Sequence, residues 1–91
     1  MKGAELIRAA SAAYHGRQAP ELPAWLAGEL MAAGIGGEPF PLDPPNRVMV
    51  AAQRCGRGQP IEGIPLTPRQ RRIARGIAKT WQASQKNHLA A

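Results

Sequence analysis

A shortage of large apolar side chains constrains this 91-residue chain more than any other feature of its sequence. Alanine supplies 17 of its 40 apolar residues, whereas Leu, Ile, Val and Phe together supply 16, about 18% of the chain. That share lies just below the ~20% at which a chain begins to resemble a disordered one. A domain of this size buries only ~60–65% of its unfolded surface even when well packed. We therefore expect a thin core and a dimer or higher oligomer, in which the chain shares apolar surface with a copy of itself or with a partner.

Glycine and proline divide the chain into four segments whose apolar residues recur at helical spacing, and no stretch alternates as a β-strand would. The expected helices cover about 2–15, 20–33, 43–55 and 67–86, with a frayed tail at 87–91. The predicted fold class is therefore all-α. We expect a single small domain, 1–91, in which the helices form an antiparallel bundle joined by Gly- and Pro-rich loops.

Capping residues support these helix ends. Asp43 stands before Pro44 as an N-cap, and Gly16, Gly34 and Gly56 are expected to end the first three helices. The clearest start is the sequence 67–70, where an N-cap threonine, a proline and a glutamine at the third helical position form a capping box. Gly28 inside the second helix costs up to ~1 kcal/mol relative to alanine, which predicts a close helix neighbour there or a marginal segment.

Apolar stripes along the helices predict the core. The side chains expected to be best buried are Trp25, Leu26, Leu30, Val48, Ile73, Ile77 and Trp81. Apolar residues in the two long loops are expected to attach those loops to the core: Ile35, Phe40, Leu42, Ile61, Ile64 and Leu66.

The net charge of +6 is distributed unevenly along the chain. Residues 1–43 carry a net charge of −2, whereas residues 44–91 carry +8. Such asymmetry is typical of a protein with a polyanionic partner. It also permits head-to-tail association between an acidic and a basic half. A solvated basic surface without a dedicated partner is the plainer alternative.

The last expected helix carries most of this positive charge. At 100° per residue, Ile73, Ile77 and Trp81 lie on one side of it. Five cations lie on the other side: Arg71, Arg72, Arg75, Lys79 and Lys86. No acid follows Glu62, and arginine suits bidentate contact with phosphate or carboxylate. The predicted binding surface, for nucleic acid or an acidic partner, is completed by Arg54, Arg57 and Arg69.

Two function classes fit this surface. The first is a regulatory or accessory protein that binds a polyanion, DNA above all, mainly through phosphates. Three glutamines are candidate base readers: Gln70, Gln82 and Gln85. The loops are too long for a helix-turn-helix, and the aromatic residues are too few for base-stacking platforms. The second class is an inhibitor or adaptor of the kind that phages and mobile elements encode. It docks on a host protein, which can present an acidic surface, and its interface is centred on aromatic or aliphatic anchors rather than on the cations.

An enzyme, a metal site and a cofactor are not expected. The two histidines, His15 and His88, lie at a helix end and in the expected tail, and the six carboxylates are scattered. The single cysteine, Cys55, is read as a small buried apolar residue and leaves no disulfide framework. No stretch reaches the ~18 apolar residues of a membrane span, and the first residues do not resemble a signal peptide. We therefore expect a cytoplasmic protein.

Overall fold

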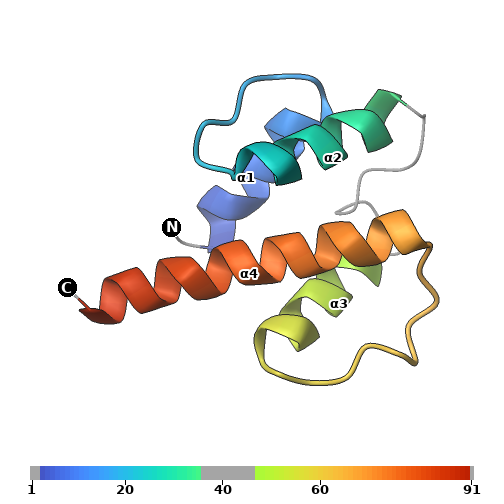
Figure 1. Ribbon diagram of the computed structural model, residues 1–91, viewed down its shortest axis with the longest axis vertical. Coiled ribbons are helices and arrows are strands. Elements are labelled where there is room, and N and C mark those ends of the chain that lie inside the picture. Colours follow the sequence, from blue (N-terminus) through green and yellow to red (C-terminus); the bar gives the residue numbers. More distant parts are fainter. Residues whose placement is uncertain (1–2, 36–46, 91) are drawn as a thin grey trace.

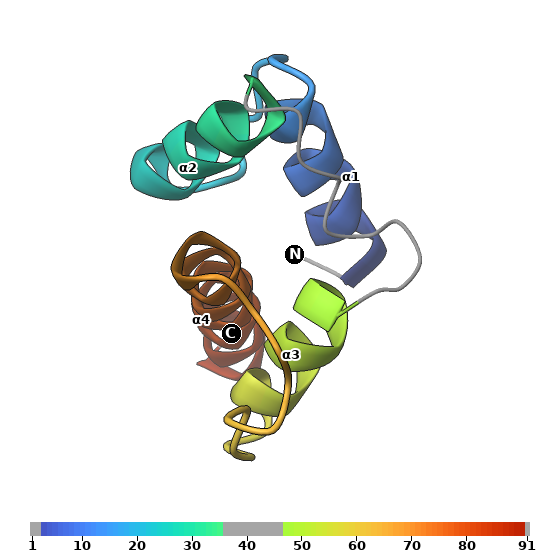
Figure 2. The ribbon, with the colours of Figure 1, turned by 90° about the vertical axis from the view of Figure 1, so that its right-hand side faces the viewer.

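The computed structural model describes residues 3–35 and 47–90, without the side chains of Ile35 and residues 86–90. Within these ranges the chain forms helices and no strand: α1 (Gly3–Tyr14), α2 (Ala24–Ile35), α3 (Arg47–Gly56) and α4 (Pro68–Ala90). The all-α class and the small bundle are thereby confirmed. Figures 1 and 2 show the helices in two pairs, α1 beside α2 and α3 beside α4, with the pairs facing each other.

Three helix boundaries differ from the expected ones. The second helix ends at Ile35, so Gly34, which was expected to end it, lies inside it, and Ile35 belongs to the helix instead of the loop. The second helix begins at Ala24, not near Pro20, because a residue that precedes proline avoids the helical conformation and Leu22 precedes Pro23. The last helix continues to Ala90 where a frayed tail was expected, since no glycine or proline follows Gly76 to interrupt it. The predicted cap at Asp43 and the anchors Phe40 and Leu42 lie outside the described residues.

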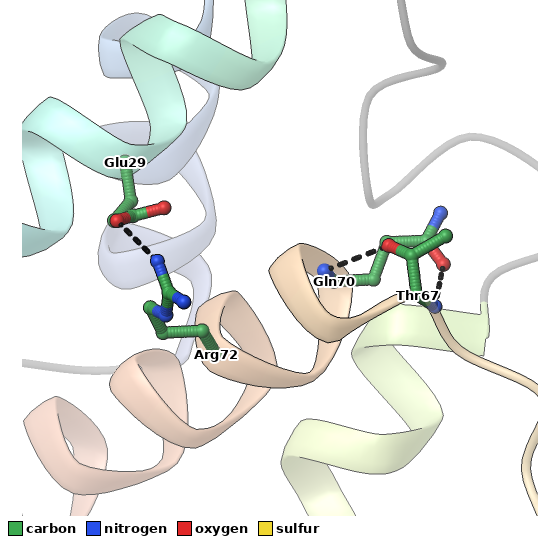
Figure 3. A network of polar contacts seen from close by, with 4 residues as sticks. All are labelled: Glu29, Thr67, Gln70 and Arg72. Carbon is green, nitrogen blue, oxygen red and sulfur yellow. Dashed lines mark hydrogen bonds and ion pairs between the residues drawn. The ribbon is translucent and has the colours of Figure 1, made fainter.

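Local capping follows the sequence closely. The Gln70 N–H donates to Thr67 Oγ1 at 3.1 Å while the Thr67 N–H donates to Gln70 Oε1 at 3.0 Å, which confirms the capping box (Figure 3). Gly16, with φ of 80°, ends α1, and the Arg17 N–H reaches back to the Ala12 carbonyl at 2.8 Å. The corresponding glycine after α3 is Gly58, with φ of 76°, two residues beyond the predicted end.

The helices within each pair are not antiparallel, and there the expectation of an antiparallel bundle is wrong. It holds for α2 and α4: Trp25 lies at Gly76, and Glu29, further along α2, pairs with Arg72, which comes earlier in α4. The C-terminal ends of α1 and α2 meet, because Gly34 lies against the backbone carbonyl of Tyr14. The end of α3 lies against the second half of α4, where Gln82 Nε2 donates to the Gly56 carbonyl at 3.0 Å (Figure 1). The connection 15–23 permits this, since it can span ~30 Å when extended whereas α1 is only ~18 Å long.

The core confirms most of the predicted residues and corrects two. Five of them are buried: Leu26, Leu30, Val48, Ile73 and Ile77. The prediction that both tryptophans are among the best-buried side chains is wrong. Trp25 is 49% exposed, and Trp81 is only half-buried. Alanines such as Ala13, Ala51 and Ala74 occupy the centre of the helix contacts and leave no room there for an indole. In the connection 57–67, Ile61 is buried, and Ile64 and Leu66 are partly buried against the core.

Glycines at two positions of α2 differ in their surroundings. A Cβ atom at Gly28 would meet nothing within 4 Å in the described structure, so of the two alternatives predicted there the close helix neighbour is not found. A Cβ atom at Gly34 would overlap the carbonyl oxygen of Tyr14. Because that oxygen belongs to the backbone of α1, only a shift of the helix could relieve the overlap.

We expect Gly34→Ala to lower the free energy of unfolding by ~1–3 kcal/mol, as overpacking does elsewhere. Gly28→Ala, the matched control in the same helix, should raise it by up to ~1 kcal/mol through helix propensity alone. Urea denaturation of both variants measures the two changes. A Gly34→Ala protein as stable as Gly28→Ala would contradict the close contact between α1 and α2.

Candidate nucleic-acid interface

Four of the eight predicted binding residues come together on α4. Arg72, Arg75 and Lys79 are exposed and Arg71 is half-buried. They line one hollow of about 360 Å³, together with Pro68, Gly76 and Trp25 from α2. Of the remaining candidates, Arg54, Arg57 and Arg69 are exposed and do not line this hollow, and the side chain of Lys86 lies outside the described part. We call the seven lining residues the cationic hollow.

Trp25 is the member of the cationic hollow that sequence reasoning missed. Its indole rests on α4 at Gly76, where an added Cβ would lie 2.6 Å from Cη2 and 3.2 Å from Cζ3 of the ring. A side chain at position 76 would therefore displace the indole. The signal in the sequence was Gly76 itself, because a glycine inside a helix often marks the close approach of another element.

An acid from another helix reaches the cationic hollow. Glu29 of α2 pairs with Arg72, whose Nη1 lies 2.9 Å from Glu29 Oε1, as Figure 3 shows. The sequence places these residues 43 positions apart, so the charge pattern along α4 could not reveal the pair. Among the described residues, Arg71, Arg75 and Lys79 form no ion pair.

The partial positive charge of the N-terminus of α4 disfavours a cation in the first turn of this helix. The helix begins at Pro68 and has no acid in its first turn, which contains Arg69. A helix N-terminus carries partial positive charge, so a cation there is unfavourable by ~0.3–1 kcal/mol and an anion is favourable. The first turn of α4 thus favours an anion over the cation of Arg69.

A second hollow, of about 290 Å³, has a different chemistry. It is mostly apolar and lies between α1 and the α3–α4 pair, where Leu6, Ile7 and Met49 face Ile77 and Trp81. Arg57 contributes the cation among its lining residues. Ile7 is 38% exposed, so part of this apolar surface is open to solvent.

The described ranges 3–35 and 47–90 hold no group of three or more His, Cys, Asp or Glu side chains that could bind a metal ion. Cys55 is partly buried against the core, and the ring of His15 meets that of Tyr14 edge-on at 5.4 Å. None of the helices in these ranges combines the length and the apolar character needed to cross a membrane.

Comparison of the chain with protein-family models, with curated proteins and with solved structures finds no match. The geometry and charge of the two hollows are therefore the features that indicate a function.

The Glu29–Arg72 pair should contribute little to stability because the Arg72 side chain is 60% exposed. Exposed ion pairs typically contribute ~0–1 kcal/mol, and salt screens them. A double-mutant cycle of Glu29→Gln and Arg72→Gln, followed by urea denaturation, should give a coupling energy below ~1 kcal/mol. A coupling above ~2 kcal/mol, persisting in high salt, would show that the pair holds α2 on α4.

Proposed function

We propose that this protein is a small non-enzymatic accessory or regulatory protein that binds a polyanion, DNA before others, through the cationic hollow of α4. The observation that carries the proposal is the gathering of four cations around one hollow, of which Glu29 neutralises one. Arg71, Arg75 and Lys79 keep their charges available to an anion within the described structure.

Binding through phosphates is favoured over the reading of base edges. Two of the three glutamines that could read bases are already engaged: Gln70 in the capping box and Gln82 on the Gly56 carbonyl. The long connection 57–67 between α3 and α4 also differs from the turn of ~3–4 residues in a helix-turn-helix. Contacts to phosphates give affinity that depends on salt and little on sequence.

We also propose that the protein associates with further copies of itself and that it does so in the cytoplasm. Several large apolar side chains outside the cationic hollow keep more than a third of their surface exposed: Ile7, Met31 and Val50. Their burial against a second copy would add to a core that is poor in large side chains.

The proposal predicts a specific salt dependence. Each phosphate contact on duplex DNA contributes ~0.9 to the slope of log K against log salt. The double variant Arg71→Ala/Arg75→Ala should therefore flatten the slope by about two units and weaken binding to all sequences similarly. Affinity titrations of duplex DNA at several salt concentrations measure the slope.

The matched control is Arg8→Ala/Arg17→Ala, which removes the same charge from exposed positions in and after α1. This variant should leave the slope close to that of the unaltered protein. An equal slope for all three proteins, or no binding to any nucleic acid at low salt, would overturn the proposal.

A protein partner is the second candidate function, in which the chain inhibits or redirects a host protein. The apolar hollow favours it, because exposed Ile7 lies near Trp81, and Arg57 can face an acidic group on a partner. Arginine and tryptophan are frequent anchors of protein interfaces.

Capture from a nuclease-treated bacterial lysate in moderate salt tests this candidate. A specific partner should be retained by Arg71→Ala/Arg75→Ala and lost with Ile7→Ser/Arg57→Ala, because only the second variant alters the apolar hollow. The reverse pattern, or a complex that nuclease abolishes, would exclude the apolar hollow as its interface.

A further inference from the structure

Trp25, a member of the cationic hollow, occupies an unusual position for a large aromatic side chain. Its indole is half exposed although aromatic side chains commonly bury ~150–250 Å² each. One edge of the ring is fixed on Gly76, and Leu26 from the same helix also reaches the surface of α4 at that glycine. The indole is therefore held in place by packing while about half of its surface remains in water.

The surroundings of this indole combine two kinds of recognition. Arg71, Arg72, Arg75 and Lys79 line the hollow that Trp25 borders, and its volume of about 360 Å³ lies in the ~300–1,000 Å³ range of ligand pockets. A ligand that satisfies both the aromatic surface and the cations needs a flat aromatic group and several negative charges. A nucleotide chain has both, because each base is linked to a phosphate.

A base can stack on an indole only when it has left the stack of a double helix. In a duplex the base faces contact neighbouring bases, and proteins reach only the base edges and the phosphates. Unpaired bases in single strands stack readily on aromatic side chains while a positive groove follows the backbone.

We propose that Trp25 stacks on an unpaired base while the cations of α4 hold the adjacent phosphates, so that the cationic hollow prefers single-stranded nucleic acid over duplex. This inference rests on the proposed function and specifies its substrate class. It also revises the expectation that the aromatic residues are too few for stacking, since one indole with four cations forms a site for one base and its flanking phosphates.

The test uses fluorescence, because the chain contains only two tryptophans. Trp81→Phe leaves Trp25 as the single reporter, and Trp81 is only half-buried, so the change should be tolerated. Three probes share one sequence of about 12 nucleotides that cannot pair with itself: single-stranded DNA, single-stranded RNA, and the DNA annealed to its complement. This length is chosen because single-strand binding sites cover ~4–16 nucleotides. A single strand should quench Trp25 and bind more tightly than the duplex, and the DNA and RNA arms identify which strand is preferred.

Substitution of Trp25 then measures the stacking. Trp25→Ala should weaken single-strand binding by about 5- to 150-fold, the range that loss of one stacked base produces, and should change duplex binding less than ~2-fold. Trp25→Phe should fall between, because a smaller ring still stacks. Met31→Ala is the control, since it removes another exposed apolar side chain from α2 outside the hollow. Circular dichroism melting establishes whether each variant is folded. If Trp25→Ala is unfolded, the quenching of Trp25 and the affinity of Trp25→Phe for the single strand decide between stacking and its absence.

The two proposals fail in different ways. Equal binding of single strand and duplex, no quenching of Trp25 and unchanged affinity of Trp25→Phe and Trp25→Ala would overturn the stacking inference. The salt dependence on Arg71 and Arg75 would in that case still support the proposed function. Absence of binding to every nucleic acid at low salt would overturn both.

Discussion

Close contact between helices through alanine and glycine is the constraint on which the rest of this structure depends. Nine of the 19 buried apolar residues in the described part are alanine. Each buries little surface, so the helices must approach closely for dispersion forces to accumulate, and a gap of less than 1 Å already loses a quarter to a half of a contact's attraction. The contact of Gly34 with the Tyr14 carbonyl shows how close the approach is. The two indoles are accommodated where a glycine faces each of them, Trp81 at Gly56 and Trp25 at Gly76.

The same constraint positions the candidate site. Gly76 lets α2 approach α4, and the indole of Trp25 fills the space that a side chain at this position would take. Glu29 lies one turn further along α2 and reaches Arg72 across the same contact. The cationic hollow therefore results from how α2 crosses α4 as much as from the charges of α4 itself. A variant that moved α2 would change both the aromatic and the charged part of the hollow.

The sequence predicted the features that depend on a few neighbouring residues. The four helices, the capping box of Thr67 and Gln70, the αL glycine at Gly16 and the anchor Ile61 all follow from local chemistry. The direction of the helices within each pair could not be predicted, because it depends on tertiary contacts that a connection as long as 57–67 leaves open. For the site, the cations of α4 were identified from their spacing. Trp25 and Glu29 were not, since their role arises only from packing between helices distant in sequence.

The location of the cations on α4 is physically reasonable because this helix has the strongest local support in the chain. It is the longest of the described helices, with 23 residues, and both partners of its capping box are in place. An N-cap contributes ~1 kcal/mol, which offsets the ~0.3–1 kcal/mol penalty of a cation in the first turn. Repulsion between exposed cations is further reduced by salt, whose screening length is ~8 Å at physiological ionic strength. Folding brings Trp25 to these cations. Under the proposed function, a polyanion that bridges them would therefore bind the folded chain better than the unfolded one and would stabilise the thin core through mass action.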